Sequence, residues 1–363
     1  MSLLRELLTR AISLAASDVH IKENQPCIFR VGDALTPGSP QVFTRDDVVR
    51  VAQDILPAHC VKPFADRQEV DFSFEEPDVG RFRVNIYFSR GAPTISMRYV
   101  KNRIPTFEEL HLPLIMKQIA LSPRGVVLLT GATGSGKSNS LAAMIQEINV
   151  THDVRIITIE NPIEYILQDQ KACISQREIG IDTGSFREAL RHVMRQDPDV
   201  IVIGEMRDAP SFVAAVTAAE TGHLVFSSLH ADTASQALPR ILNFFPHLER
   251  DQVRASLAAN LRAVICQRLV PAVGGGLMPA VEVLINTPAV RKLIERNNLD
   301  KLPAAIETGT EDGMQTFNQS FYRLIKGGRI TEEDGLRRSD NAEALKMNLK
   351  GIFLDESRRI LSA

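Results

Sequence analysis

The amino-acid sequence predicts an α/β protein in which a mostly parallel sheet follows a smaller α+β domain. From about residue 114 onward, short apolar runs alternate with helix-forming segments, as in a parallel sheet that helices cover on both faces. Before residue 100, three strand-like runs follow one another closely, as in a small antiparallel sheet. The 363 residues also exceed what one ordinary hydrophobic core needs, which favours two domains.

The composition restricts the classes of function. The 42 basic and 44 acidic residues nearly balance, so we expect no nucleic-acid partner, and a DNA-translocating motor is disfavoured. No apolar run approaches the roughly 18 residues that a membrane-spanning helix needs. The four cysteines lie far apart and form no C-x-x-C pair. This spacing predicts no zinc site and favours a reducing, cytoplasmic location.

The first hundred residues predict the elements of the small domain in order. Residues 1–16 place apolar side chains at helical spacing between charged ones, which indicates an amphipathic helix rather than a signal peptide. Residues 27–31 form a predicted strand, and Thr44 begins a predicted helix that runs to about Ile55. The antiparallel meander that follows consists of residues 71–74, 81–88 and 94–100.

The domain boundaries follow from the change in pattern. Residues 101–113 are polar and contain proline, so we interpret them as a linker between a domain at 1–100 and a domain at 114–363. From about residue 287 to 363 the chain predicts a helical extension, in which Thr331 and Asp340 mark helix starts.

The larger domain predicts four strands whose carboxyl ends all carry polar groups. The strands are residues 126–130, 155–160, 200–204 and 223–229, and helices such as 185–194 and 210–221 lie between them. Ligands bind at the carboxyl ends of the strands in an open parallel sheet. The polar groups at these ends are a glycine-rich loop, Glu160, Glu205 and His230.

The glycine-rich loop is the most specific signal. Residues 131–138 read G-x-x-x-x-G-K-S between a predicted strand and a predicted helix, which is the context that a phosphate-binding P-loop requires and a chance glycine-rich turn lacks. We expect Lys137 to reach the β- and γ-phosphates and Ser138 to hold Mg²⁺. The predicted nucleotide-binding residues here are Gly131, Ala132, Thr133, Gly134, Ser135, Gly136, Lys137, Ser138 and Asn139.

Three glutamates are candidates for metal or water chemistry. Glu205 ends an apolar strand at the Walker B position, where an acid holds the Mg²⁺ shell or activates the attacking water. Glu160 and Glu164 close another strand, and carboxylates near a triphosphate are costly unless they serve metal or water. The alternatives are an exposed strand-end glutamate for Glu205 and a capping or surface role for the other two. The predicted metal ligands are Ser138 and Glu160.

Two histidines and three arginines complete the candidates. His223 and His230 bracket a predicted strand on opposite faces, so they are not a metal pair. We predict His230 as a catalytic residue that senses the γ-phosphate and His223 as nucleotide-binding; the alternative for each is a structural histidine. From composition alone, we interpret three arginines of the first domain as part of a solvated basic face. These are Arg83, Arg90 and Arg98.

Taken in order, these motifs resemble those of the secretion ATPases that drive type II secretion and type IV pili. Their Walker A, Asp box, Walker B and His box correspond to residues 131–138, 158–164, 197–208 and 221–230. Residues 16–20 and 80–85 resemble the N-terminal domain of the same family, and residues 289–294 its retraction branch. Residues 269–282 lack the four-cysteine zinc loop of the extension ATPases, so the chain resembles the PilT/PilU twitching-motility group.

The resemblance implies a PAS-like domain, a RecA-like motor domain and a homo-hexameric ring that hydrolyses ATP with Mg²⁺ to retract a pilus. It implies a location at the cytoplasmic face of the inner membrane, through a platform protein, with a paralogous retraction ATPase as a further partner. It assigns Glu205 as the catalytic glutamate, Glu160 as the Asp-box acid and the three arginines to the phosphates.

One residue departs from the family pattern. Asn161 stands where the Asp box usually carries an aspartate, and an amide cannot act as a base or carry a carboxylate charge. This leaves open an alternative function as a low-turnover nucleotide-binding accessory subunit of a pilus or type II secretion machine.

Overall fold

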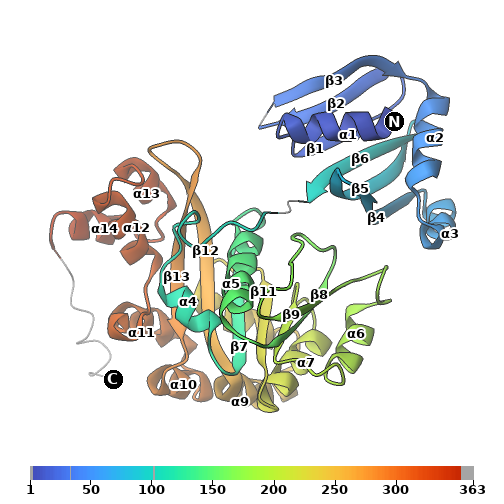
Figure 1. The fold of residues 1–363 in the computed structure, drawn as a ribbon. Helices are drawn as coiled ribbons and strands as arrows, with labels where there is room; N and C mark the ends of the chain where they lie inside the picture. The colour runs from blue at the N-terminus through green and yellow to red at the C-terminus, as the bar shows by residue number, and fades with distance from the viewer. Residues whose placement is uncertain (1–2, 33, 101–102, 353–363) are drawn as a thin grey trace. The chain divides into compact units, whose positions relative to one another are not determined.

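The computed structural model describes residues 3–32, 34–100 and 103–352 (Figure 1). The chain divides into two compact units, residues 1–103 with 162–166 and residues 104–161 with 167–363. The first residues of the predicted N-terminal helix, linker residues 101–102 and the end of the predicted extension lie outside the described residues. Among the described residues, no helix is long and apolar enough to cross a bilayer.

The first unit is an antiparallel sheet with the strand order β3-β2-β1-β6-β5-β4 and three helices. Its elements are α1 (Leu3–Ser13), β1 (Asp18–Ile21), β2 (Gln25–Val31), β3 (Ala34–Phe43), α2 (Arg45–Ile55), α3 (Ala58–Arg67), β4 (Glu69–Glu76), β5 (Gly80–Ser89) and β6 (Ala92–Val100). The predicted strands and the first two helices are present, whereas β1, β3 and α3 were not predicted.

Local chemistry explains the sharp boundaries of this unit. Thr44 and Asp47 form a capping box at the start of α2, where the Thr44 side chain accepts from the Asp47 amide and the Asp47 carboxylate accepts from the Thr44 amide. Between β5 and β6 the chain reverses at Arg90 and Gly91, whose φ angles are 53° and 77°. Positive φ at both positions matches the right-handed twist of a two-residue hairpin. This hairpin brings Arg83 of β5 opposite Arg98 of β6.

The second unit is built around a sheet with the order β13-β12-β7-β11-β10-β8-β9, in which neighbouring strands are parallel except for β12 and β13, which are antiparallel. Its strands are β7 (Gly125–Thr130), β8 (Arg155–Glu160), β9 (Cys173–Glu178), β10 (Val200–Ile203), β11 (Leu224–Leu229), β12 (Leu261–Pro271) and β13 (Leu277–Ile285). The predicted parallel-rich α/β class is confirmed, and the four predicted strands lie side by side in the sheet, whereas β9, β12 and β13 were not predicted.

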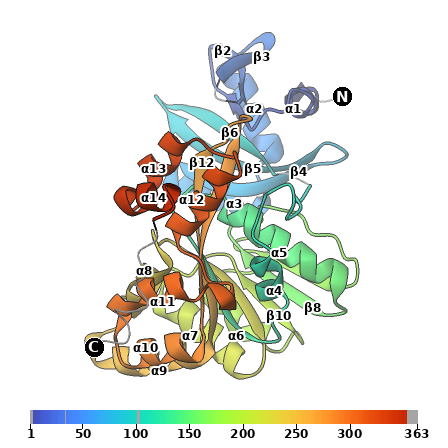
Figure 2. The same cartoon turned by 90° about the vertical axis from the view of Figure 1, so that its left-hand side faces the viewer.

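Helices connect these strands and continue beyond them. They are α4 (Ile115–Ala120), α5 (Lys137–Thr151), α6 (Phe186–Val193), α7 (Ala209–Glu220), α8 (Ala234–Leu242), α9 (Arg250–Asn260), α10 (Pro288–Glu295), α11 (Leu302–Thr308), α12 (Phe317–Lys326), α13 (Glu332–Arg338) and α14 (Ala342–Leu349). Figure 2 shows α12, α13 and α14 grouped together, where α13 packs on β12, α12 packs on β13 and α14 packs on the other two helices. Thr331 caps α13 as predicted, but Asn341 rather than Asp340 caps α14.

The predicted linker at residues 101–113 is too long. Phe107 and Leu112 are only 4% and 7% exposed and belong to the core of the second unit. Residues 104–113 therefore pack as part of that unit, because two large apolar side chains in a polar stretch gain more from burial than from exposure.

Strand β13 lies at the edge of the sheet, and the side of β13 that faces away from β12 forms hydrogen bonds with Gln315, just before α12, and with Ser320 of α12. Val283 and Gln315 exchange backbone hydrogen bonds of 2.8 and 3.2 Å, and Gln315 Nε2 donates to Val281 O at 2.7 Å. The Val281 amide donates to Ser320 Oγ at 3.1 Å. Polar groups of the edge strand are thereby paired within the unit, as buried backbone groups require.

A carboxylate lies inside this region. Glu282 on β13 is 8% exposed and accepts a hydrogen bond from the Ala234 amide at 2.6 Å. Burial raises the pKa of Glu282 from its ordinary 4.5 to about 7, although the Ala234 amide and Arg268 oppose the rise. The native protein therefore binds this proton more tightly than the unfolded chain does. The stability of wild-type protein should fall as pH rises from about 4.5 to 7, because this group loses its proton later in the folded state.

Glu282→Gln should remove this pH dependence, because the amide is neutral at every pH. Between pH 5 and pH 8, the free energy of unfolding of wild type should fall relative to that of the variant by up to about 3 kcal/mol. This estimate uses about 1.36 kcal/mol per pKa unit. Urea unfolding of both proteins at the two pH values measures the difference, with Glu343→Gln on exposed α14 as the matched control. Parallel pH curves for wild type and Glu282→Gln would contradict the assignment.

Candidate active site

The glycine-rich loop joins β7 to α5 at the carboxyl edge of the second sheet. Gly131, Gly134 and Gly136 have φ angles of 139°, 78° and 87°, which only glycine adopts readily. Helix α5 begins at Lys137, whose Nζ donates to Gly131 O at 2.8 Å and Ala132 O at 2.9 Å. The loop thus places backbone amides at a helix start, where the helix dipole favours an anion.

The loop is packed closely on one side and open on another. A Cβ at Gly131 would lie 2.5 Å from Gln267 O, and a Cβ at Gly136 would lie 2.6 Å from Gln267 Nε2. A Cβ at Gly134 would meet nothing within 4 Å. Ser140 Oγ on α5 also donates to Gln267 Oε1 at 2.7 Å. Gln267 of β12 therefore packs against the loop. No motif in the sequence predicted Gln267 as a site residue.

The residues present fit a phosphate ligand. The buried Ser135 Oγ has no hydrogen-bond partner within the described part of the chain, and Gly134 leaves the loop open beside it. Ser138 follows Lys137 in the first turn of α5, and hydroxyl and carboxylate oxygens are the ligand types that Mg²⁺ prefers.

Glu205 lies just after β10 and contacts the side chains of Arg207 and His230. Its carboxylate accepts from Arg207 Nη2 at 2.6 Å and lies 3.4 Å from His230 Nε2. The hydrogen bond from Arg207 lowers the pKa of Glu205 below its ordinary value, with Coulombic help from Arg207, His230 and Lys137, although partial burial raises it. Glu205 is therefore an ionised acceptor at neutral pH. Arg207 was not predicted as a site residue, although it lies within the matched motif.

The strand that ends at Glu160 and the strand that precedes Glu205 are neighbours in the sheet. Glu160 ends β8, and its Oε1 accepts from Thr158 Oγ1 at 2.6 Å and Gln176 Nε2 at 3.1 Å. A Cβ at Gly204 would lie 3.4 Å from the Glu160 Cα, so β8 and β10 end in contact. Glu164 is exposed and belongs to residues 162–166, which group with the first unit, so its role stays a prediction.

His230 reaches this edge of the sheet, but His223 does not. His230 follows β11, whose Leu229 pairs with Thr130 at the end of β7. His223 precedes β11 at the opposite edge, about 20 Å away at 3.3 Å per strand residue. Its ring Nδ1 lies 2.9 Å from Ala218 O, at the end of α7. The structure therefore supports the structural alternative for His223, because both ends of one strand cannot reach the same ligand.

The three arginines of the first unit lie on or beside one hairpin. Arg83 and Arg98 are exposed cross-strand partners, and Arg98 Nε donates to the Asp18 carboxylate at 2.8 Å. Arg90 is exposed in the β5–β6 turn. Two positive charges thus lie opposite each other on the sheet, and the Asp18 carboxylate offsets the charge of Arg98.

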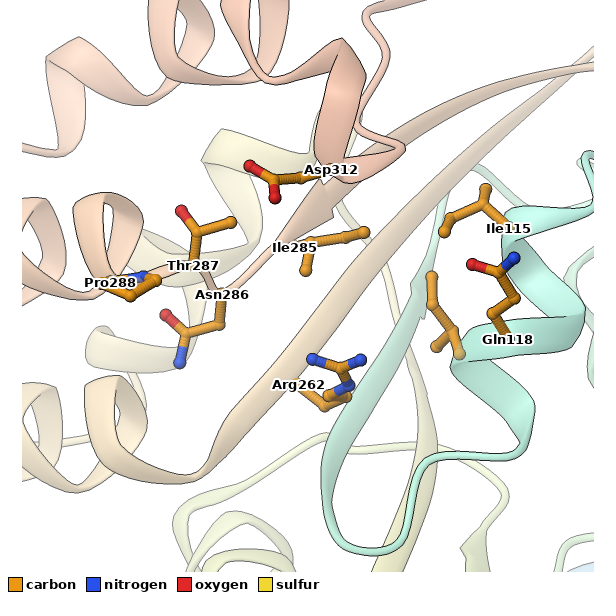
Figure 3. Close-up of a pocket in the computed structure, with 9 residues that line it drawn as sticks. Ile115, Gln118, Arg262, Ile285, Asn286, Thr287, Pro288 and Asp312 are labelled. Atoms are coloured by element: carbon orange, nitrogen blue, oxygen red, sulfur yellow. The ribbon is translucent and has the colours of Figure 1, made fainter.

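A separate pocket lies at the end of the second sheet opposite the P-loop, where β12 begins and β13 ends. It has a volume of about 310 Å³ and is lined by residues of α4, the start of β12 and the β13–α10 junction (Figure 3). None of the predicted site residues lines it. In the described part of the chain, no group of three or more His, Cys, Asp and Glu side chains could hold a metal ion.

The parallel sheet, the P-loop at its carboxyl edge and the adjoining acid define a RecA-like P-loop ATPase. Residues 1–276 match the family model of the type II/IV secretion system protein. The chain therefore belongs to that family.

Relatives and solved structures support the same placement. The chain is 40% identical to the type IV pilus ATPase PilU of Pseudomonas aeruginosa, over 95% of this chain and 91% of PilU. It is 42% identical to a twitching motility protein of Neisseria gonorrhoeae, over 95% of this chain and 92% of that protein. A crystal structure of the pilus retraction motor PilT with bound ADP is 39% identical and superposes with a TM-score of 0.87, covering 94% of this chain and 98% of that one.

Gly131→Ala should damage the loop more than Gly134→Ala, although both glycines have positive φ. The new methyl group at Gly131 meets the Gln267 carbonyl, whereas the one at Gly134 enters open space. We expect Gly134→Ala to cost about 1–2 kcal/mol of stability from backbone strain. Gly131→Ala should cost more and also lower ADP affinity on the order of tenfold or more.

Urea unfolding and titration with a fluorescent ADP analogue measure the two quantities. Because each variant adds the same methyl group to the same loop, Gly134→Ala is the matched control. Equal losses in both variants would show that the contact with Gln267 does not shape the loop.

Proposed function

We propose that this chain hydrolyses ATP to power retraction of a type IV pilus. The observation that carries the proposal is similarity along almost the whole chain to pilus ATPases and to a retraction motor, together with a P-loop, Glu205 and His230 at one sheet edge. A fold alone would not support an activity, because one fold hosts many functions. Here the site residues support it as well.

The site residues have distinct proposed roles. Lys137 would leave the loop carbonyls to bind the β- and γ-phosphates, while the loop amides hold the phosphate oxygens. Ser138 and Glu160 would hold Mg²⁺, which would neutralise charge on the phosphates when bound. Glu205, ionised and held by Arg207, would accept a proton from the attacking water. His230 lies against Glu205 and would orient it.

The three arginines of the first unit would act on the same nucleotide. Arginine keeps its charge and grips phosphate oxygens with a planar fork. Arg83 lies opposite Arg98, and the single Asp18 carboxylate beside Arg98 leaves a net positive charge on the pair that a phosphate would complement. This supports a phosphate-binding role over a plain solvated face for Arg83 and Arg98, with Arg90 in the adjacent turn.

The assembly follows from the family resemblance. We propose a homo-hexamer that works at the cytoplasmic face of the inner membrane, bound to a platform protein and acting with a paralogous retraction ATPase. The alternative is an accessory subunit that binds nucleotide with little turnover, which Asn161 favours because it replaces an expected carboxylate. Phosphate release by the purified protein separates the two, since an accessory subunit would bind ATP without steady-state release.

Glu205→Gln should separate hydrolysis from binding. The amide keeps the shape of the side chain but cannot accept the proton, so turnover should fall on the order of 10²-fold while ATP affinity stays within about threefold. Lys137→Ala should lose both, because its charge contacts the phosphates in the ground state as well. Phosphate release and equilibrium nucleotide binding measure the two effects, with exposed Glu249→Gln as the matched control.

The cellular test uses the same variants. In a strain that lacks the gene, wild type and Glu249→Gln should restore twitching, whereas Glu205→Gln and Lys137→Ala should leave cells piliated but unable to retract. Full twitching with Glu205→Gln would contradict the proposed function, even if hydrolysis in vitro were lost.

Arg83→Ala and Arg98→Ala should reduce turnover far more than binding. An arginine that stabilises charge in the transition state contributes on the order of 10³ in rate, while ATP affinity should change by less than about tenfold. Arg50→Ala is the matched control, because Arg50 is an exposed residue of α2 in the same unit. Normal turnover in both variants would return Arg83 and Arg98 to a solvated surface role.

A further inference from the structure

The loop that carries His230 joins β11 to α8 and consists of residues 230–233. Three side chains of the β12–β13 hairpin hold successive backbone groups of this loop and of the first residue of α8. We propose that Cys266, Arg268 and Glu282, named here the loop clamp, are positioning residues that keep His230 against Glu205. This inference rests on the proposed role of His230 in ATP hydrolysis.

The contacts of the loop clamp follow the chain in order. Cys266 Sγ donates to Ala231 O at 3.4 Å, and Arg268 Nη2 donates to Asp232 O at 2.9 Å. The Ala234 amide donates to Glu282 Oε2 at 2.6 Å. The backbone just after His230 is therefore bound at three points within four residues. A loop held in this way cannot rotate freely about His230.

The hairpin geometry puts the three side chains on one face. Cys266 and Glu282 are cross-strand partners in the β12–β13 ladder, and Arg268 lies two residues beyond Cys266. Side chains two residues apart on a strand point to the same face. Gln267 lies between them and faces the P-loop instead. One strand thus supports the P-loop with one face and the His230 loop with the other.

The chemistry of each group suits its contact. Burial raises the pKa of Cys266 to about 12, so the thiol keeps the proton that it donates to Ala231 O. Glu282 is buried, and a buried carboxyl needs partners such as the Ala234 amide. Arg268 can serve several acceptors because its guanidinium carries five N–H donors in a fixed fork.

Arg268 also contacts the C-terminal helices. Its Nη1 donates to Arg338 O at 3.0 Å and to Asp340 Oδ1 at 2.9 Å, and its guanidinium lies 4.0 Å from the centre of the Phe317 ring. The segment between α13 and α14 is therefore linked through one side chain to the backbone two residues after His230. Any displacement of that segment would disturb the position of the His230 loop.

The catalytic consequence follows from how sensitive catalysis is to position. His230 Nε2 lies 3.4 Å from Glu205 Oε1, close to the limit of a direct interaction. A displacement of about 1 Å in a catalytic group can cost on the order of 10²-fold in rate. Loss of the loop clamp should therefore lower kcat through His230, while the P-loop and its nucleotide affinity remain.

The decisive experiment is a double-mutant cycle between Arg268 and His230. In the wild-type background, Arg268→Ala should lower kcat by about tenfold or more and change KM by less than about threefold. In the His230→Ala background, the same change should lower kcat by less than about twofold, because the residue that it positions is gone. Arg262→Ala is the matched control, since Arg262 lies at the other end of the same strand, where it lines the separate pocket (Figure 3) and its Nε donates to Ser122 Oγ at 2.9 Å.

Further variants keep the test decisive if Arg268→Ala does not fold. Arg268→Lys keeps the positive charge but loses the fork, so it should fold and still lose most of the kcat that Arg268→Ala loses. Glu282→Gln keeps an oxygen that can accept from the Ala234 amide and should retain turnover. Glu282→Leu removes the acceptor, so this variant should lose turnover. Thermal unfolding of each variant confirms that it is folded.

The outcomes separate this inference from the proposed function. Additive effects of Arg268→Ala and His230→Ala in an active enzyme would overturn the loop clamp and leave ATP hydrolysis intact. Unchanged kcat in His230→Ala, or equal turnover in Glu282→Gln and Glu282→Leu, would overturn it as well. Absence of ATP hydrolysis by wild-type protein would instead contradict the proposed function.

Discussion

The backbone hydrogen-bond register of four parallel strands is the constraint on which the candidate site depends. In β7, β11, β10 and β8 the paired residues advance together, so that Thr130 lies beside Leu229 and Ile203 beside Ile159. The groups that follow these positions must then meet at one edge. A slip of one residue in any strand would turn its side chains to the other face and separate the groups.

Much of the fold could be predicted because its signals are local. Strands β7 and β10 are apolar runs, and Thr44 and Thr331 are followed by acids that complete the first turn of a helix. The β12–β13 hairpin escaped prediction because polar residues, among them Gln267, Arg268 and Glu282, interrupt its apolar runs. Asp340 failed as a helix cap because its carboxylate binds Arg268 and leaves Asn341 to cap α14.

In the candidate site, too, the residues in short local motifs were predicted and those that the fold brings from elsewhere were not. The P-loop, Glu205 and His230 were predictable because each sits in a short motif at the end of a strand. Gln267 was not, because it meets the P-loop across more than a hundred residues of chain and no motif records that contact. His223 was predicted in the site because it belongs to the same motif as His230, residues 221–230, but β11 separates the two histidines.

The closure of β13 by Gln315 and Ser320 has a consequence for the protein before it is fully folded or after it is cut. Until the chain beyond residue 314 docks, the amides and carbonyls of Val281 and Val283 form an open strand edge in an apolar setting. Such an edge is a template for pairing with a second chain. The C-terminal helices therefore protect against aggregation, and a proteolytic cut before them would release a self-associating fragment rather than a smaller motor.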